Sequence, residues 1–390
     1  MEYPRGVTDR LESGDTMKKN KMIAAGLICI DIAPIFENGK DSDINKIMSP
    51  GKLTEVGNAD IHTGGSVANT GLAMKILGAD VSLMGKIGDD EFGRMILGIL
   101  DQYQASEGMI IDKESSTSYT VVLAIPGIDR IFLHNPGANS TFSKKDLDFN
   151  IIKEAGLFHF GYPTIMESMY ADGGCELTDM FKAVKETGCM TSLDMSSVDE
   201  NSKSGKADWK KILENTLPYV DFFLPSVEEI CYMLNKEKYQ ELQVRAKGGD
   251  ITEVLSIEED VVPLAEQILA MGCKFVMIKC GAAGFYYQTK GADAFAELEA
   301  DSGIDFSTFA DKKGFEKSYV PKAVVSGTGA GDTTIGAFLT AMVKGYPFSR
   351  CLQLAAATGA SCVEAIDALG GLRSFDDLIE KIDSGWKKNE

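Results

Sequence analysis

Short apolar runs alternate along the chain with stretches in which apolar positions recur at helical spacing. Six runs have the length of a buried strand: Met22 to Ile30, Val81 to Met84, Leu157 to Phe160, Met190 to Leu193, Phe222 to Leu224 and Phe275 to Ile278. Strands that are apolar on both faces and separated by helices are typical of parallel pairing. The pattern therefore predicts an α/β fold, a three-layer α/β/α sandwich around a mostly parallel central sheet.

One passage interrupts this alternation. Ser118 to Ile125 and Arg130 to His134 have the composition of strands, and the turn from Pro126 to Asp129 separates them. This arrangement predicts an antiparallel hairpin. The segment from Ile32 to Ile61 also lacks a helical period, so we expect it to supply further strands. A small β-sheet lid would then come from about residues 32–62 and 115–137.

The ends and insertions of the domain are marked by polar composition. Residues 1–20 are polar and show no period, so we interpret them as an N-terminal extension and assign residues 21–390 to the folded domain. Residues 235–260 and 289–318 are acidic and weakly periodic. We expect both stretches to lie on the surface.

Charge and cysteine content restrict the partners. The chain carries 39 Lys and Arg against 58 Asp and Glu, a net charge of −19 that would repel a phosphate backbone. We therefore expect a small-molecule ligand, with no nucleic acid or membrane as partner. No apolar stretch reaches the ~20 residues that a membrane helix needs. The eight cysteines lack zinc-site spacing and are typical of reduced thiols, which favours a cytoplasmic protein.

The most informative segment is the glycine run from Gly327 to Asp332, which leads into a helical pattern. Backbone N–H groups at a glycine-rich helix start can hold an anion without any basic side chain. The carboxylate of Asp332 would repel a bound phosphate unless it takes a proton from an attacking hydroxyl. Asp is also a favoured helix cap. At this point Asp332 is a candidate for either role.

A second glycine pair, Gly64-Gly65, precedes another helical run in which Asn69 stands one turn in. Paired glycines let a ligand approach the backbone, and the Asn69 amide can both donate to and accept from sugar hydroxyls. Gly78 and Asp89 or Asp90 have the positions of ordinary helix-end residues. The chain lacks G-x-x-x-x-G-K-[ST] and has no G-x-G-x-x-G after its first strand, which disfavours P-loop NTPases and Rossmann dehydrogenases.

These motifs, in this order, resemble the ribokinase-like (PfkB) carbohydrate kinase family from about Met22 to Arg373. The resemblance rests on six segments: Gly26 to Asp31, the G-G-x-x-A-N helix, the G-D-D-x-F-G turn, Pro136 to Asn139, Lys279 to Gly284 and the glycine–Asp run. It implies a ribokinase-like fold and a kinase that uses ATP and Mg²⁺ to phosphorylate a hydroxyl group of a sugar or sugar-like molecule.

The resemblance also implies roles for individual residues. Asp332 is the catalytic base, and the anion hole is formed by Gly329, Ala330 and Gly331. The residues that hold the acceptor are Asp31, Gly64, Gly65 and Asn69. Arg130 beside the lid turn is a further acceptor candidate, although a solvated charge is the commoner role in a hairpin. The implied nucleotide contacts are Lys279, Gly281, Gly284, Thr328 and Gly329, with ion pairing as the other interpretation of Lys279.

Two departures from the family pattern concern metal ions. The N-x-x-E motif, which acts on Mg²⁺ through water, reads Ser226-Val227-Glu228-Glu229 here, so Glu229 is kept and Ser226 replaces Asn. A hydroxyl can still orient water, so we expect Mg²⁺ use to persist. Ser326 replaces the first Asp of D-T-x-G-A-G-D, which leaves activation by a monovalent cation open.

Other functions remain possible on the same scaffold. A nucleoside acceptor fits the same scaffold, and a sugar-binding regulator without turnover is compatible with the changes at Ser226 and Ser326. The presence of Asp332 argues against the regulator. Lid sheets in this family often meet their copy in a second subunit, so the resemblance also implies a homodimer through the lid.

Overall fold

The computed structural model describes residues 20–36, 44–47, 49–125 and 131–389. Its main sheet has eight strands, in spatial order β4 (Val81–Met84), β1 (Met22–Gly26), β9 (Leu157–Gly161), β10 (Met190–Asp194), β11 (Phe222–Phe223), β12 (Phe275–Lys279), β13 (Gly284–Thr289) and β14 (Lys313–Lys317). In this spatial order, neighbouring strands from β4 as far as β12 are parallel. Strand β13 pairs antiparallel with both β12 and β14. The predicted α/β fold with a mostly parallel sheet is confirmed.

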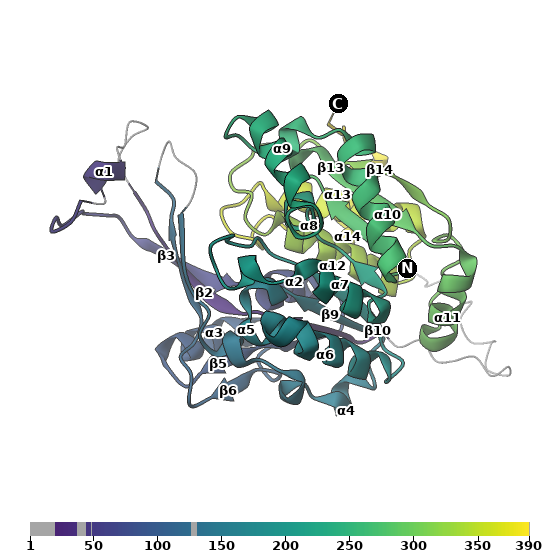
Figure 1. Cartoon of the computed structure of the whole chain (residues 1–390), viewed down its shortest axis with the longest axis horizontal. Coiled ribbons are helices and arrows are strands. Elements are labelled where there is room, and N and C mark those ends of the chain that lie inside the picture. Colours follow the sequence, from purple (N-terminus) through teal and green to yellow (C-terminus); the bar gives the residue numbers. More distant parts are fainter. Residues whose placement is uncertain (1–19, 37–43, 48, 126–130, 390) are drawn as a thin grey trace, which may run out of the picture.

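Helices cover both faces of this sheet (Figure 1). Both faces are covered because successive residues of β1 point to opposite faces and all are apolar. Met22 and Ala24 belong to one buried apolar cluster, and Ile23 and Ala25 belong to the other. The first cluster includes residues of α2 (Ser66–Ile76), α3 (Glu91–Gln102), α12 (Ala330–Val343), α13 (Phe348–Cys362) and α14 (Phe375–Asp383). The second includes residues of α6 (Cys175–Lys185), α7 (Trp209–Thr216), α8 (Val227–Leu234) and α10 (Val262–Met271).

Further helices and a two-stranded sheet lie outside these two groups of helices. They are α1 (Ile44–Ile47), α4 (Phe149–Ile152), α5 (Glu167–Tyr170), α9 (Lys236–Ala246), α11 (Ala292–Ser302) and the two-stranded sheet of β5 (Lys86–Gly88) and β6 (Ile110–Asp112). Asp90 caps α3 by accepting from the N–H of Gly93 at 2.9 Å, as predicted for this turn. Within the described ranges, no helix has the length and apolar character needed to cross a membrane.

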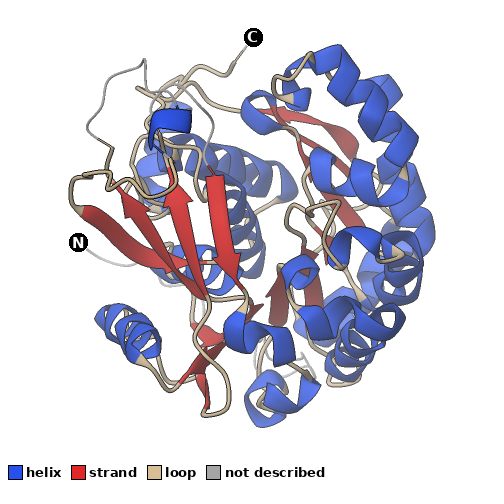
Figure 2. Ribbon diagram, turned by 60° about the vertical axis from the view of Figure 1, so that its left-hand side comes forward, coloured by secondary structure: helices blue, strands red, loops and turns tan. Residues whose placement is uncertain are grey.

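A second sheet of four strands stands at one side of the molecule (Figures 1 and 2). Its order is β3 (Ala59–Gly64), β2 (Cys29–Pro34), β7 (Tyr119–Leu123) and β8 (Ile131–Asn135). We call it the lid sheet. The antiparallel pair β7–β8 confirms the predicted hairpin. Its turn, residues 126–129, and Arg130 lie outside the described residues.

The prediction of one strand from Met22 to Ile30 is wrong. The chain leaves the main sheet after Gly26, whose φ is +129°, and enters the lid sheet at Cys29. A Cβ on Gly26 would lie 2.3 Å from the Gly161 carbonyl oxygen, so the crossover requires glycine. Asn139 then holds the backbone of Ile28 by accepting its N–H at 3.3 Å and donating to its C=O at 2.8 Å. One unbroken apolar run thus serves two sheets.

The acidic stretch 289–318 does not merely lie on the surface. It supplies β14, the edge strand of the main sheet, and a cluster of buried rings from Phe295, Phe306 and Phe309. These rings come from a helix and the loop after it, so their spacing follows no single period. Residues 235–260 fit the expectation better, because α9 buries only Leu242.

Candidate active site

The glycine run forms an open helix start. Gly329 is the N-cap of α12 with φ +74°, and no side chain caps the helix. A Cβ at Gly329 would lie 2.2 Å from the Ala368 Cβ, so both its conformation and its contacts require glycine. The first backbone amides of α12 are therefore free of side-chain partners and can receive an anion.

Asp332 is the third residue of α12, and the interpretation as a helix cap is wrong. Asp332 as a whole is only 4% exposed, and its carboxylate accepts from three side chains of other elements. Asn69 Nδ2 donates to Oδ2 at 2.9 Å, and Thr70 Oγ1 donates to Oδ1 at 3.4 Å. The Tyr162 hydroxyl lies 2.9 Å from each oxygen. Contacts from α2 and from the residue after β9 thus fix the orientation of this carboxylate.

The environment of Asp332 makes it a stronger base. Burial raises the pKa of its carboxyl above the ordinary value of 3.8, and the charge of Glu229 acts in the same direction. Hydrogen bonds from Asn69 and Tyr162 and the charge of Lys279 oppose this shift without cancelling it. A base with a raised pKa takes a proton more readily near neutral pH.

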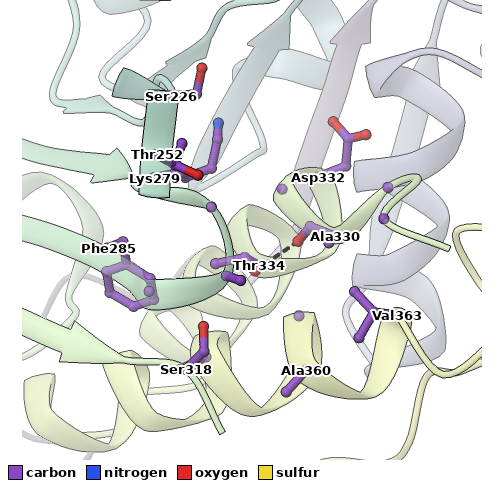
Figure 3. Close-up of a pocket in the computed structure, with 18 of the residues that line it drawn as sticks. Ser226, Thr252, Lys279, Phe285, Ser318, Ala330, Asp332, Thr334, Ala360 and Val363 are labelled. Atoms are coloured by element: carbon purple, nitrogen blue, oxygen red, sulfur yellow. Dashed lines mark hydrogen bonds between the residues drawn. The ribbon is translucent and has the colours of Figure 1, made fainter. Parts of the chain in front are cut away.

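A cavity of about 700 Å³ opens beside the start of α12 (Figure 3). Figure 3 shows Lys279 and Asp332 at one end of the view and Phe285, Ala360 and Val363 toward the other. The lining therefore has a charged part and an apolar part. It includes these residues predicted from the sequence: Glu229, Lys279, Gly281, Gly284, Gly329, Ala330, Gly331 and Asp332. Among the described residues, Gly327 and Gly329 line the cavity, whereas Thr328 between them does not.

Lys279 at the end of β12 is paired at the charged part of the cavity. Its Nζ lies 2.7 Å from Asp194 Oδ1 and also donates to the Leu224 carbonyl oxygen at 2.5 Å. Burial raises the pKa of Asp194, although the charge of Lys279 opposes the shift. Burial disfavours the charge on Lys279, but Asp194 and Glu229 outweigh it and raise its pKa. Carboxylates outnumber the cation here, so the site attracts positive charge.

Glu229 has a structural role as well as a place in the cavity. Its Oε2 accepts the backbone N–H of Ser226 at 2.6 Å, and Ser226 Oγ accepts the N–H of Glu229 at 3.3 Å. This capping box starts α8 and fixes the carboxylate at the cavity edge. Across the part of the chain that the structure describes, no three His, Cys, Asp or Glu side chains converge to hold a metal ion.

The predicted acceptor residues lie on the lid side of Asp332. Gly64 ends β3 against the Asp31 carboxylate, and a Cβ there would lie 2.2 Å from Asp31 Oδ2. Gly65, with φ +85°, is the N-cap of α2, which carries Asn69 to Asp332. Strand register places Asp31 in one row across the lid sheet with His62, Thr120 and His134.

This row is polar, and its four side chains make contacts in two pairs. His62 Nδ1 lies 3.9 Å from Asp31 Oδ2, and Thr120 Oγ1 lies 3.0 Å from His134 Nδ1. Burial lowers the pKa of His134, although Asp31 opposes the shift, so its ring is neutral at neutral pH. The Nε2 atom of His134 is buried without a partner in the described structure. The row thus offers both carboxylate and imidazole groups to a hydroxylated ligand.

Sequence reasoning missed Tyr162 and Asp194. Tyr162 directly follows β9, and Asp194 ends β10, so both lie at the carboxyl edge of the parallel sheet. The neighbouring strands β1 and β9 lead in opposite directions. The chain continues from β1 toward β4 at one end of the sheet, and from β9 toward β10 and the other end. Ligands of open α/β sheets bind at such a point. Polar residues at the carboxyl ends of the predicted strands were the signal that could have found them.

Comparisons with known proteins agree with this architecture. Residues 24–372 match the model of the pfkB family carbohydrate kinase. Fructokinase-2 from Zea mays is 26% identical over 351 residues, which cover 84% of this chain and 88% of that protein.

Solved structures show the same fold. The ribokinase from Arabidopsis thaliana, complexed with ribose and ATP, has a TM-score of 0.67 at 19% identity and covers 93% of this chain and 98% of its own. The nucleoside kinase from Methanocaldococcus jannaschii has a TM-score of 0.62 at 18% identity, with 94% and 99% covered. Since the family match spans both sheets and the glycine run at the start of α12, the chain belongs to the pfkB family and is a carbohydrate kinase.

Proposed function

We propose that this protein transfers the γ-phosphoryl group of ATP to a hydroxyl group of a sugar, with Asp332 as the catalytic base. One observation carries the proposal: a buried carboxylate with a raised pKa stands two residues inside an uncapped helix start, at the edge of a large cavity. The helix start can bind the phosphoryl group in transfer, and the carboxylate can accept the proton of the attacking hydroxyl.

The two parts of the cavity fit the two parts of ATP. The apolar part is lined by Phe285, Ala356, Ala360 and Val363, which suit a purine ring. The charged part holds Lys279 and the start of α12, which suit the phosphates. A volume of about 700 Å³ lies within the range of pockets that take ligands of this size. The Arabidopsis ribokinase of the same fold contains ATP.

Mg²⁺ fits the charged part of this cavity. Mg²⁺ keeps several waters and is usually bound through one or two carboxylates together with substrate phosphates, so a site made only of protein groups is not required. Besides Asp332, the carboxylates of Glu229 and Asp194 line the cavity near Lys279, and we propose that Glu229 holds the ion through water. The ion would supply positive charge to the phosphates where carboxylates outnumber Lys279.

The chain's own groups then perform the transfer. Asp332 takes the proton as the acceptor oxygen attacks the phosphorus in line, and the amides around Gly329 to Gly331 stabilise the charge on the transferring group. Lys279, held in place by Asp194, is available to the phosphate oxygens. The bond between the transferred phosphorus and the ADP oxygen breaks.

The acceptor is best placed between Asp332 and the lid sheet. Asp31 and the neighbouring polar row present groups that bind several hydroxyls at once, and this favours a sugar over a flat base. A nucleoside remains the second candidate, because the nucleoside kinase compared above has the same fold. Arg130 lies outside the described residues, so its proposed role as a further contact to the acceptor rests on the sequence alone.

No requirement for a monovalent cation is proposed. Ser326, which replaces the family's first Asp, uses its Oγ to accept the N–H of Thr328 at 3.1 Å. A neutral hydroxyl engaged in its own turn attracts a cation less than a carboxylate does.

We also propose that two chains associate through their lid sheets. Register places Ile61, Ile32, Val121 and Leu133 in one apolar row on the face opposite to Asp31. Ile61 and Leu133 are 42% and 52% exposed at the ends of this row. Ile32 in the middle of the row packs against the chain's own core, so a second lid would cover the exposed ends of the row.

The experiment that tests the function is ADP formation with ATP and Mg²⁺ on a panel of hexoses, pentoses and nucleosides. We expect turnover with one or a few sugars and a phosphorylated sugar in the ³¹P NMR spectrum. Turnover with nucleosides alone would show that the acceptor is a nucleoside and not a free sugar. Sugar binding by calorimetry without any ADP formation would identify a binding protein and refute the proposal.

A further inference from the structure

Three side-chain donors contact the carboxylate of Asp332. A carboxylate offers about four lone-pair sites. Asn69 donates to one oxygen and Thr70 donates to the other at 3.4 Å, whereas the single proton of the Tyr162 hydroxyl is shared between both oxygens. Of these three donors, Tyr162 lines the cavity together with Asp332, so an acceptor hydroxyl that approaches Asp332 from the cavity competes with the Tyr162 hydroxyl.

Tyr162 is the donor that can leave. Asn69 and Thr70 lie on α2, are 8% and 0% exposed, and pack directly against α12. Tyr162 stands in the connection after β9, is only partly buried and lines the cavity. Its φ of +67° is left-handed, a strained conformation for a residue other than glycine. Its hydroxyl also makes the contact with Asp332 that an attacking alcohol would make.

We propose that Tyr162 is a positioning residue that holds Asp332 until the acceptor hydroxyl displaces its O–H from the carboxylate. This inference rests on the proposed role of Asp332 as base. After displacement, the acceptor proton moves to Asp332, the acceptor oxygen bonds to phosphorus, and the bond to ADP breaks. Before displacement, Asp332 is not available to activate a water molecule, so ATP is not hydrolysed without an acceptor.

The charge state of Tyr162 suits this role. Burial and the neighbouring charge of Asp332 raise the pKa of its hydroxyl well above its ordinary value, so Tyr162 remains a donor at physiological pH. Its donation favours the ionised form of Asp332. Removing the hydroxyl should therefore raise the pKa of Asp332 and leave the carboxylate open to a water or an acceptor.

The test is Tyr162→Phe, measured beside Tyr232→Phe. Tyr232 also donates its hydroxyl inside the protein, to the Gly205 carbonyl at 2.9 Å, but does not line the cavity. In Tyr162→Phe we expect ATP hydrolysis without acceptor to rise about tenfold and the acceptor KM to fall about tenfold, the value of one hydrogen bond to a charged group. The acid limb of kcat/KM should move up by about one pH unit. Tyr232→Phe should move none of these.

Two outcomes would overturn the proposal. If Tyr162→Phe lowers kcat while hydrolysis and the acceptor KM stay unchanged, Tyr162 remains on Asp332 during turnover. If the variant behaves as Tyr232→Phe does, the contact has no role in the reaction. Should Tyr162→Phe fail to fold, Tyr162→Asn removes the same hydroxyl with a residue that accepts left-handed backbone, and the same readouts apply.

A second comparison separates this proposal from the proposed function. If Asp332→Asn keeps its turnover, Asp332 is not the base and both proposals fail. If Asp332→Asn is inactive while Tyr162→Phe is unchanged, only the displacement is refuted. The variant that combines Tyr162→Phe with Asp332→Asn should show no rise in ATP hydrolysis, because Tyr162 acts through Asp332.

Discussion

A substitution at Gly331 tests whether the start of α12 binds the transferring phosphoryl group. A Cβ at this position would lie 3.3 Å from Lys279 Cε and 3.5 Å from Lys279 Cδ. The two methyl groups of a valine would therefore extend into the space between the helix start and Lys279, where the transferring phosphoryl group is proposed to lie. Loss of one donor to a transition-state anion costs roughly 10²- to 10³-fold in kcat, about 3 to 4 kcal/mol.

We expect Gly331→Val to lower kcat by that factor while acceptor affinity, measured by calorimetry without ATP, stays within about twofold. The exposed helix residue Gly98, around which a Cβ would meet nothing within 4 Å, provides the control variant Gly98→Val. Thermal unfolding of both variants checks the fold. An equal loss of turnover and acceptor affinity in Gly331→Val, or no loss of either, would refute the reasoning.

Two further predictions concern pH and assembly. Asp332 must be ionised to accept a proton, and burial raises its pKa. The value of kcat/KM should therefore rise with pH, and the midpoint of this rise should lie above pH 3.8. A limb at or below 3.8 in the pH–rate profile would contradict this assignment. Leu133→Asp places a charge in the exposed apolar row of the lid and should convert a dimer into a monomer by light scattering at micromolar concentration. A wild-type protein that is already monomeric would exclude the lid interface.

The strands of the main sheet could be predicted because each is a short apolar run with turns on either side. The crossover at Gly26 could not, because residues 22–30 are apolar throughout and the change of sheet depends on contacts with Gly161 and Asn139, which lie more than a hundred residues away. Phe306 and Phe309 were missed for a related reason, since loop residues that are buried by tertiary packing follow no period.

The candidate site was predictable where chemistry requires glycine or a fixed motif. Gly329 has a positive φ and no room for a Cβ, so its sequence signal is direct. Tyr162 and Asp194 belong to no motif, and their only sequence signal is their position at the carboxyl ends of adjacent parallel strands, which meet at the same edge of the sheet. The choice between base and cap for Asp332 was also a tertiary question, and its partners on α2 and after β9 decide against the cap.

The most direct test of the account is the turnover of Asp332→Asn on the sugar that the panel identifies. Asn keeps the size of the side chain, and α12 is not capped by residue 332, so the fold and ATP affinity should change little. We expect kcat to fall by roughly 10²- to 10⁴-fold, the contribution of a general base. Near wild-type turnover in this variant, with ATP affinity unchanged, would contradict the assignment of Asp332 as the catalytic base.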